Sequence, residues 1–230
     1  MKKRINFLTL LSLIICLIPF VVYFYLHSQL PESIPIHYNL SGTADRFVSS
    51  SSYEVLLLCS GSLLGFMFIK LISFIIVKFT LSLQESNSKT SYLVMNAVTF
   101  FTVLLSSILS IYFLLVSANI QTLHTNTLFN ISNFVLGLLA IVIGNYMPKF
   151  RPSRFSGFRT GATLSDETVW LKTQRFAARS WIIGGIALIV LSVAFSSAPL
   201  IFTLVLSPLI YIMMTAVPFV YSYRLLKFIN

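Results

Sequence analysis

The chain has 230 residues, of which 57% are hydrophobic and only 10% are charged. A soluble domain carries about 25% charged residues because its surface faces water, so this composition excludes a soluble globular protein. The net charge of +10 does not indicate direct binding to nucleic acid, because Lys and Arg accumulate on the cytoplasmic side of membrane spans. The composition therefore predicts an integral membrane protein.

Several apolar stretches are long enough to cross the hydrocarbon core of a bilayer, which takes about 20 helical residues. They cover residues 5–26, 53–79, 92–118, 128–147, 179–195 and 200–223. The first is longer than the apolar core of a secretory signal, and no small-residue cleavage site follows it, so we expect a retained span. The expected fold class is all-α, a polytopic membrane protein with about six transmembrane helices.

The basic residues predict the orientation of these spans. Of the 16 Lys and Arg residues, Arg46 lies in a loop opposite the amino terminus, Lys70 lies inside the second span, and the rest lie on the amino-terminal side. By the positive-inside rule, that side is cytoplasmic. We therefore expect both termini in the cytoplasm, the loop after the first span outside, and the basic loop before the fifth span inside.

The chain divides into three predicted segments. Residues 1–90 form an N-terminal transmembrane hairpin with a Pro-rich extracellular loop, and residues 91–127 form the third span and an external turn. Residues 128–230 form a membrane domain with the basic cytoplasmic loop. The cytoplasmic turn that joins the second and third spans is expected over residues 83–89.

Glycine and proline residues inside the spans predict where the helices pack closely and where they bend. Gly61 and Gly65 form a small-xxx-small pair, for which we expect a close approach of two helix backbones. Four further glycines are expected to act in the same way: Gly137, Gly144, Gly184 and Gly185. Pro208 and Pro218 should bend the sixth span, either as static kinks or as parts of a gate.

Lys70 is the ionisable residue that lies deep in a predicted span. Its long side chain is expected to extend toward the cytoplasmic interface. The spans contain no deep Asp, Glu or His, which argues against a transporter that couples to protons or sodium ions, because such proteins use intramembrane carboxylates.

The external loop contains Pro31 and Pro35, which favour extended backbone, and a turn at Ser41 and Gly42. Its candidate metal ligands are His27, Glu32, His37 and Asp45. Their spacing matches no known ligand pattern, so we expect no metal site. A folded loop that recognises a partner is the favoured interpretation.

The cytoplasmic loop leads into an amphipathic segment. Thr163 followed by Asp166 resembles a capping box, with Ser165 as an alternative N-cap. Apolar positions recur at helical spacing opposite three basic ones: Val169, Trp170, Thr173, Phe176 and Ala177 oppose Lys172, Arg175 and Arg179. This pattern predicts a basic helix that continues into the fifth span. It either lies on anionic lipid or forms a docking surface for a cytoplasmic partner.

No catalytic or cofactor-binding motif occurs in the sequence. There is no nucleophile elbow, zinc-protease motif, phosphate-binding loop or pair of carboxylates in a protected site. We therefore expect neither enzymatic activity nor a cofactor.

At the cytoplasmic loop, the chain resembles the SdpI family of bacterial membrane proteins, whose best-known members are toxin-immunity proteins. The resemblance lies in residues 157–165, Val169, Trp170 and Thr173. Residues 35–46 are similar to a small domain of unknown function that often precedes the SdpI-like part. Two positions depart from the family pattern, which has Asn where Ser153 stands and His or Asn where Gln174 stands.

The resemblance implies site residues in both loops. In the cytoplasmic loop they are Gly157, Arg159, Thr160, Thr163, Leu164 and Trp170, and in the external loop Pro35, His37, Gly42 and Asp45. Gly157 is expected to permit a tight turn, and Arg159 to bond lipid phosphate, a carboxylate or helix-end carbonyls. Trp170 is expected to anchor the helix at the membrane interface.

The resemblance also implies a function and a location. It indicates a multi-pass protein of the bacterial cytoplasmic membrane that protects the cell from a secreted toxic peptide. Its partners would be the lipid bilayer, an extracellular toxic peptide and a cytoplasmic repressor protein. The alternative is a transporter or a lipid-handling membrane protein.

Overall fold

A computed structural model of the chain describes residues 6–38, 44–83, 85–119, 125–153, 156–196 and 199–229. Side chains are described at these positions except 38, 76–83, 85, 86, 88 and 125. The chain forms two compact units, one comprising Met1–Ile69 with Thr99–Leu128, and the other comprising Lys70–Val98 with Phe129–Asn230. The unit boundaries fall within the second and third long helices, so both helices contribute to both units. The division of the sequence into segments 1–90, 91–127 and 128–230 stays a prediction.

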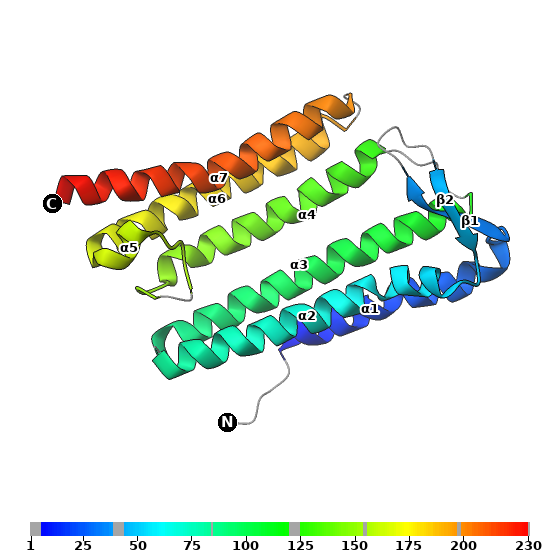
Figure 1. Ribbon diagram of the computed structural model, residues 1–230, viewed down its shortest axis with the longest axis horizontal. Helices are drawn as coiled ribbons and strands as arrows, with labels where there is room; N and C mark the ends of the chain where they lie inside the picture. The colour runs from blue at the N-terminus through cyan, green and yellow to red at the C-terminus, as the bar shows by residue number, and fades with distance from the viewer. Residues whose placement is uncertain are drawn as a thin grey trace. The chain divides into compact units, whose positions relative to one another are not determined.

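The long helices are α1 (Phe7–Leu26), α2 (Tyr53–Leu83), α3 (Glu85–Ser117), α4 (Thr125–Tyr146), α6 (Glu167–Ala194) and α7 (Leu200–Ile229) (Figure 1). Within the described part of the chain, these six helices are long and apolar enough to cross a membrane. The predicted fold class of a multi-pass membrane protein is therefore confirmed. One boundary differs from prediction, because the predicted turn at 83–89 is already helical from Glu85. The predicted continuation of the amphipathic segment into the fifth span is confirmed, since α6 contains both.

In the first unit, hydroxyl groups connect the helices. Ser62 Oγ donates to the carbonyl of Cys16 at 3.4 Å. Ser107 and Ser110 of α3 donate to the carbonyls of Ile15 at 3.2 Å and Leu58 at 3.0 Å, respectively. Small polar residues of this kind let membrane helices pack closely and supply bonds in a region without water.

An antiparallel hairpin of β1 (Ser33–Tyr38) and β2 (Ala44–Ser49) follows α1 and the short helix η1 (His27–Gln29). The prediction of extended backbone here is confirmed, although the sequence did not indicate a sheet. Ile34 pairs with Val48, and Pro35 with Phe47. Ile34 is fully buried in a cluster formed with Tyr23, Leu26, Leu30, Val55, Cys59 and Leu114. This apolar contact fixes the hairpin to the helices.

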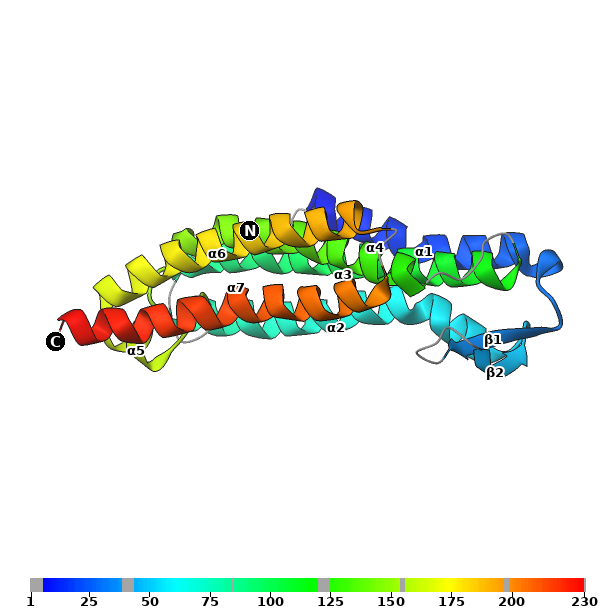
Figure 2. The same ribbon diagram turned by 90° about the horizontal axis from the view of Figure 1, so that it is seen from above.

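In the second unit, α6 and α7 lie side by side (Figures 1 and 2), and glycines bring α4 against α6. A Cβ added at Gly185 would lie 2.6 Å from the carbonyl oxygen of Gly137, and one added at Gly144 would lie 2.9 Å from that of Ala178. The close approach predicted for Gly61 and Gly65 is wrong. A Cβ added at Gly61 would have no neighbour within 4 Å, and one added at Gly65 would make only an ordinary contact. The backbones of α4 and α6 meet where a glycine of one helix faces a small residue of the other.

Polar side chains also pair inside the second unit. The Lys70 ammonium donates to Asn96 Oδ1 at 2.7 Å, a partner that the sequence did not indicate. The extension of this side chain toward the interface stays a prediction. An acceptor on the neighbouring helix holds the cation at the depth of Asn96, where leaving it without partners would be costly. Between α4 and α7, Asn133 Nδ2 donates to Ser207 Oγ at 2.8 Å. Pro208 and Pro218 lie inside the continuous helix α7.

Candidate functional site

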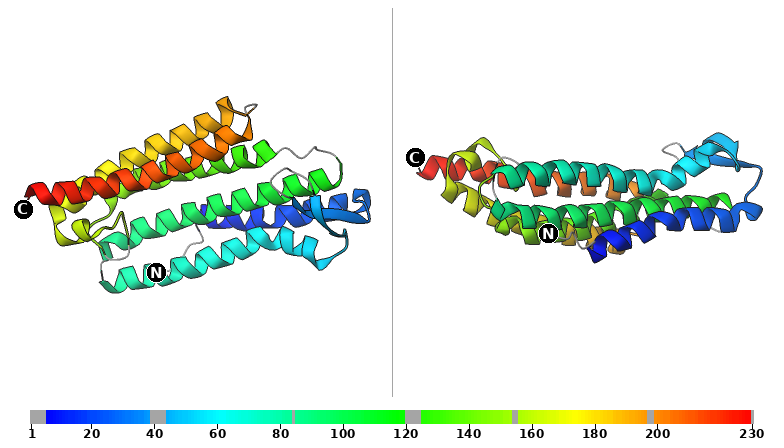
Figure 3. Two further views of the ribbon diagram at one scale, coloured as in Figure 1. Left: turned by 45° about the horizontal axis from the view of Figure 1, so that its top comes forward. Right: turned by 90° about the horizontal axis from the view of Figure 1, so that it is seen from below.

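The loop that resembles the family motif connects the short helix η2 (Met147–Lys149) to α5 (Gly161–Ser165). Both views of Figure 3 show it close to the carboxy-terminal part of α7. Gly157 has φ +89°, and an added Cβ would lie 2.8 Å from Trp170 Cζ2. Both the positive φ and the lack of space require glycine. The structure therefore agrees with a tight turn at Gly157.

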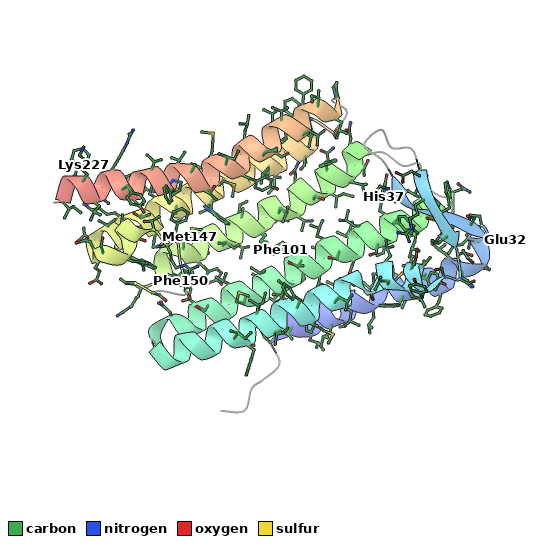
Figure 4. All side chains as sticks on the ribbon, in the orientation of Figure 1. Glu32, His37, Phe101, Met147, Phe150 and Lys227 are labelled. Atoms are coloured by element: carbon green, nitrogen blue, oxygen red, sulfur yellow. The ribbon has the colours of Figure 1, made fainter. Side chains whose placement is uncertain are left out.

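Trp170 is fully buried beneath this loop. Its indole Nε1 donates to the carbonyl of Phe150 at 2.8 Å, and Figure 4 shows Phe150 beside Met147 near the end of α4. The prediction that Trp170 anchors the helix at the membrane interface is wrong, because the loop covers the whole indole. Trp170 instead acts as the core of the loop.

Two side-chain amides hold the loop backbone. Gln174 Nε2 donates to the carbonyl of Phe158 at 2.8 Å, and the Phe158 amide donates to Gln174 Oε1 at 2.9 Å. Asn87 of α3 makes the same pair of bonds to the backbone of Arg151, both at 3.0 Å. Gln174 thus crosslinks the loop despite its departure from the family pattern. Asn87 was missed because a polar residue near a predicted turn gives no sign of a distant partner.

Each of the two helices that follow the loop has its own cap. Thr160 caps α5 in a reciprocal pair with Thr163, whose amide donates to Thr160 Oγ1 at 3.1 Å. Asp166 caps α6 by accepting from the Val169 amide at 2.7 Å. The predicted N-caps, Thr163 and Ser165, are therefore wrong. The sequence pattern did not reveal the short helix α5, so two helix starts were read as one.

Thr160 also joins the loop to α7. Its Oγ1 lies 2.9 Å from Ser222 Oγ in a buried hydrogen bond. On the other side of the loop, Ser156 Oγ lies 2.8 Å from Ser91 Oγ of α3. The motif loop is thus bonded to α3, α6 and α7, and we expect it to move with these helices.

The predicted amphipathic character of α6 is confirmed. Val169, Trp170, Thr173 and Ala177 are buried, and Lys172, Arg175 and Arg179 are exposed. The apolar face is covered by protein, since Phe176 stacks on Tyr221 with ring centroids 4.3 Å apart and Ala177 packs with Met147. The possibility that this face lies on lipid is therefore wrong.

The six predicted residues of the cytoplasmic motif fall into two groups. Gly157, Thr160, Thr163 and Trp170 form the interior of the loop through the contacts described above. Arg159 and Leu164 are exposed, with 51% of the Leu164 surface accessible. The first group maintains the shape of the loop, and the second group lies on its surface.

The external hairpin presents charged and aromatic side chains. His37 Nδ1 lies 2.5 Å from Asp45 Oδ1, and Arg46 Nη2 donates to Glu54 Oε1 at 2.9 Å. Phe47, opposite the half-buried Pro35, is 57% exposed. The hairpin therefore brings together Pro35, His37 and Asp45, whereas Gly42 lies outside the described residues.

The candidate metal ligands do not converge into one site in the described part of the chain. His37 and Asp45 pair with each other, whereas His27 contacts the Tyr23 ring in the preceding helix. Figure 4 shows Glu32 apart from His37. Among the described residues, no three of the residue types His, Cys, Asp and Glu come together.

Comparisons with known proteins match both loop regions. Residues 149–222 match the SdpI/YfhL protein family, and residues 14–60 match a domain of unknown function, DUF1648. The chain is 27% identical to Immunity protein SdpI of Bacillus subtilis (strain 168) over 195 residues, which cover 84% of this chain and 82% of that protein. No solved structure gives a significant match. The chain is thus a multi-pass cell-membrane protein in which the motif loop, α6 and most of α7 match the SdpI/YfhL protein family.

Proposed function

We propose that this chain is an immunity protein of the bacterial cytoplasmic membrane that protects the cell from a secreted toxic peptide. The strongest support is the similarity to Immunity protein SdpI, which extends over most of both chains. The protein acts by binding, without catalysis and without a cofactor. By the positive-inside rule, the hairpin faces outward, where an incoming peptide arrives first.

The hairpin is suited to recognise such a peptide. Its backbone is held by ladder hydrogen bonds and by the buried Ile34. His37, Asp45 and Phe47 are exposed on this frame. A rigid frame loses little conformational entropy when it binds, so its exposed side chains can contribute fully to affinity.

Survival of a sensitive host tests this proposal. The chain is expressed in a Bacillus subtilis 168 derivative that lacks Immunity protein SdpI and in a second sensitive strain. Each host is exposed to peptides secreted by Bacillus subtilis 168 and by the organism that encodes this chain. We expect survival with at least one source, and lower survival for the double variant His37→Ala/Phe47→Ala at an equal membrane level. Unchanged killing by every peptide would contradict the proposal.

A second proposed activity is the capture of a cytoplasmic repressor protein. The observation in its favour is that Arg159 and Leu164 are exposed on a loop that is crosslinked to three helices. Pull-down of a regulator encoded next to this gene tests it. Loss of the regulator with Arg159→Ala or Leu164→Ala supports capture, whereas equal retention by both variants counts against it. Trp170→Ala is not a clean probe, because Trp170 supports the loop from within.

A further inference from the structure

An apolar groove with a volume of about 410 Å³ opens between α6 and α7. Its sides include Ile183, Ala187, Ile210, Met213 and Val217. At Gly184, Met214 packs directly on the backbone and leaves no space for a Cβ. The groove is therefore bounded at this point, and its lining suits a hydrocarbon chain.

Arg179 lies at one end of the groove. Ala194, the last residue of α6, is 15 residues further along, a distance of about 22 Å at about 1.5 Å per residue. The hydrocarbon core is about 30 Å thick, so with Ala194 at its external edge the Arg179 backbone lies a short distance inside its cytoplasmic edge. A long Arg side chain can extend from this depth to the phosphate groups of inner-leaflet lipids, which lie just outside the core.

The positive charge at this end of the groove has no carboxylate partner within the described part of the chain. The whole sequence contains six Asp and Glu residues. The ion pairs between described side chains are His37 with Asp45 and Arg46 with Glu54. Lys172, Arg175 and Arg179 form one exposed basic row on α6. Unpaired cations above an apolar groove match a molecule with an anionic head and a hydrocarbon tail.

We propose that this groove binds one anionic phospholipid of the cytoplasmic leaflet. Arg179 holds the phosphate, with the planar guanidinium donating two parallel hydrogen bonds, and Arg175 adds charge one turn further toward the cytoplasm. An acyl chain lies along Ile183, Ala187 and Met213. Basic pockets between membrane helices bind anionic lipid headgroups by the same combination of charge and apolar surface.

Lipid retention by the purified full chain tests the proposal. Native mass spectrometry in detergent compares phosphatidylglycerol with phosphatidylcholine that carries the same acyl chains, and glycerol phosphate supplies the headgroup without a tail. We expect one tightly retained phosphatidylglycerol, with an affinity about fivefold or more above that of phosphatidylcholine. Glycerol phosphate should not be retained, because it cannot fill the groove.

Matched variants separate a defined site from general attraction to an anionic surface. Arg179→Gln should lower phosphatidylglycerol retention to the phosphatidylcholine level, Arg179→Lys should give an intermediate value, and Lys172→Gln should leave most of the retention. Ala187→Phe, which fills the groove, should lower retention of both lipids, whereas Ala194→Phe at an exposed position should not. Thermal unfolding of each variant identifies loss of fold.

Several outcomes would overturn the proposal. Equal retention of the two lipids by the unmodified chain excludes recognition of the anionic head. Equal effects of Arg179→Gln and Lys172→Gln indicate diffuse surface attraction. Unchanged retention by a folded Ala187→Phe variant excludes an acyl chain in the groove.

Discussion

The external hairpin and the cytoplasmic motif loop achieve order in opposite ways. The hairpin is held by backbone pairing and by a few buried apolar side chains such as Ile34, so most of its charged side chains point outward. The described residues of the motif loop form no ladder, and the side chains of Asn87, Trp170 and Gln174 hold the loop backbone in place. The motif residues of this loop therefore mainly maintain its shape, whereas His37 and Asp45 of the hairpin motif are exposed.

Trp170→Ala is expected to lower the stability of the chain the most. The substitution leaves a cavity under the loop and an unpaired Phe150 carbonyl, so the free energy of unfolding should fall by about 4 kcal/mol. Phe47→Ala on the hairpin is the matched aromatic control and should cost less than about 1 kcal/mol, because Phe47 is largely exposed. Thermal unfolding in detergent, followed by circular dichroism, measures both. Equal losses would contradict the distinction between the two regions.

Gly157→Ala is expected to have the next largest effect. The added methyl group meets the Trp170 ring, and the positive φ is unfavourable for alanine, so the cost should be about 2 kcal/mol. Gly61→Ala is the control, since its surroundings are open and alanine favours the helix, so its stability should be unchanged or slightly higher. The same unfolding measurement applies. Equal free energies of unfolding for the Gly157→Ala and Gly61→Ala variants would contradict tight packing of the motif loop against Trp170.

Gln174→Leu tests the amide clamp on Phe158. Removing the clamp leaves the Phe158 amide unpaired and leaves its carbonyl with the 3.4 Å hydrogen bond from Thr163 Oγ1, which should cost about 2 kcal/mol. The neighbouring exposed substitution Lys172→Ala should stay within about 0.5 kcal/mol. Proteolysis of the folded protein gives a second measurement, because an unclamped loop should be cut faster after Phe158. If Gln174→Leu were as stable and as resistant to proteolysis as the unmodified chain, the other contacts of the loop would be sufficient to hold it in place.

The smallest effect on stability is expected from His37→Ala. The pair of His37 with Asp45 is exposed, so its loss should change the free energy of unfolding by less than about 1 kcal/mol. If the hairpin meets the toxic peptide, survival should nevertheless fall. Glu32→Ala is the control and should leave survival unchanged, because Glu32 lies apart from His37 (Figure 4). Survival equal to that of the unmodified chain would remove His37 from the recognition surface.

Features that depend on local pattern were predictable. Length and hydrophobicity located six helices, because a span must be apolar over its full crossing. The spacing of Trp170, Thr173 and Ala177 against Lys172 and Arg175 predicted the two faces of α6, because helical period alone decides which residues share a face. The requirement for glycine at position 157 was suggested by the family resemblance and agrees with the observed φ of +89°.

Features that depend on contacts between distant residues were decided only by the tertiary structure. Nothing local distinguishes Gly61, which faces open space, from Gly185, which faces Gly137, because the difference lies in the helix opposite. The acceptor for Lys70, the burial of Trp170 and the clamp from Asn87 to Arg151 likewise join residues far apart in sequence. By itself, the sequence determined where the chain enters the membrane and which helix faces are apolar. The tertiary structure decided which partner each polar or small residue meets, because that partner depends on how the helices pack against one another.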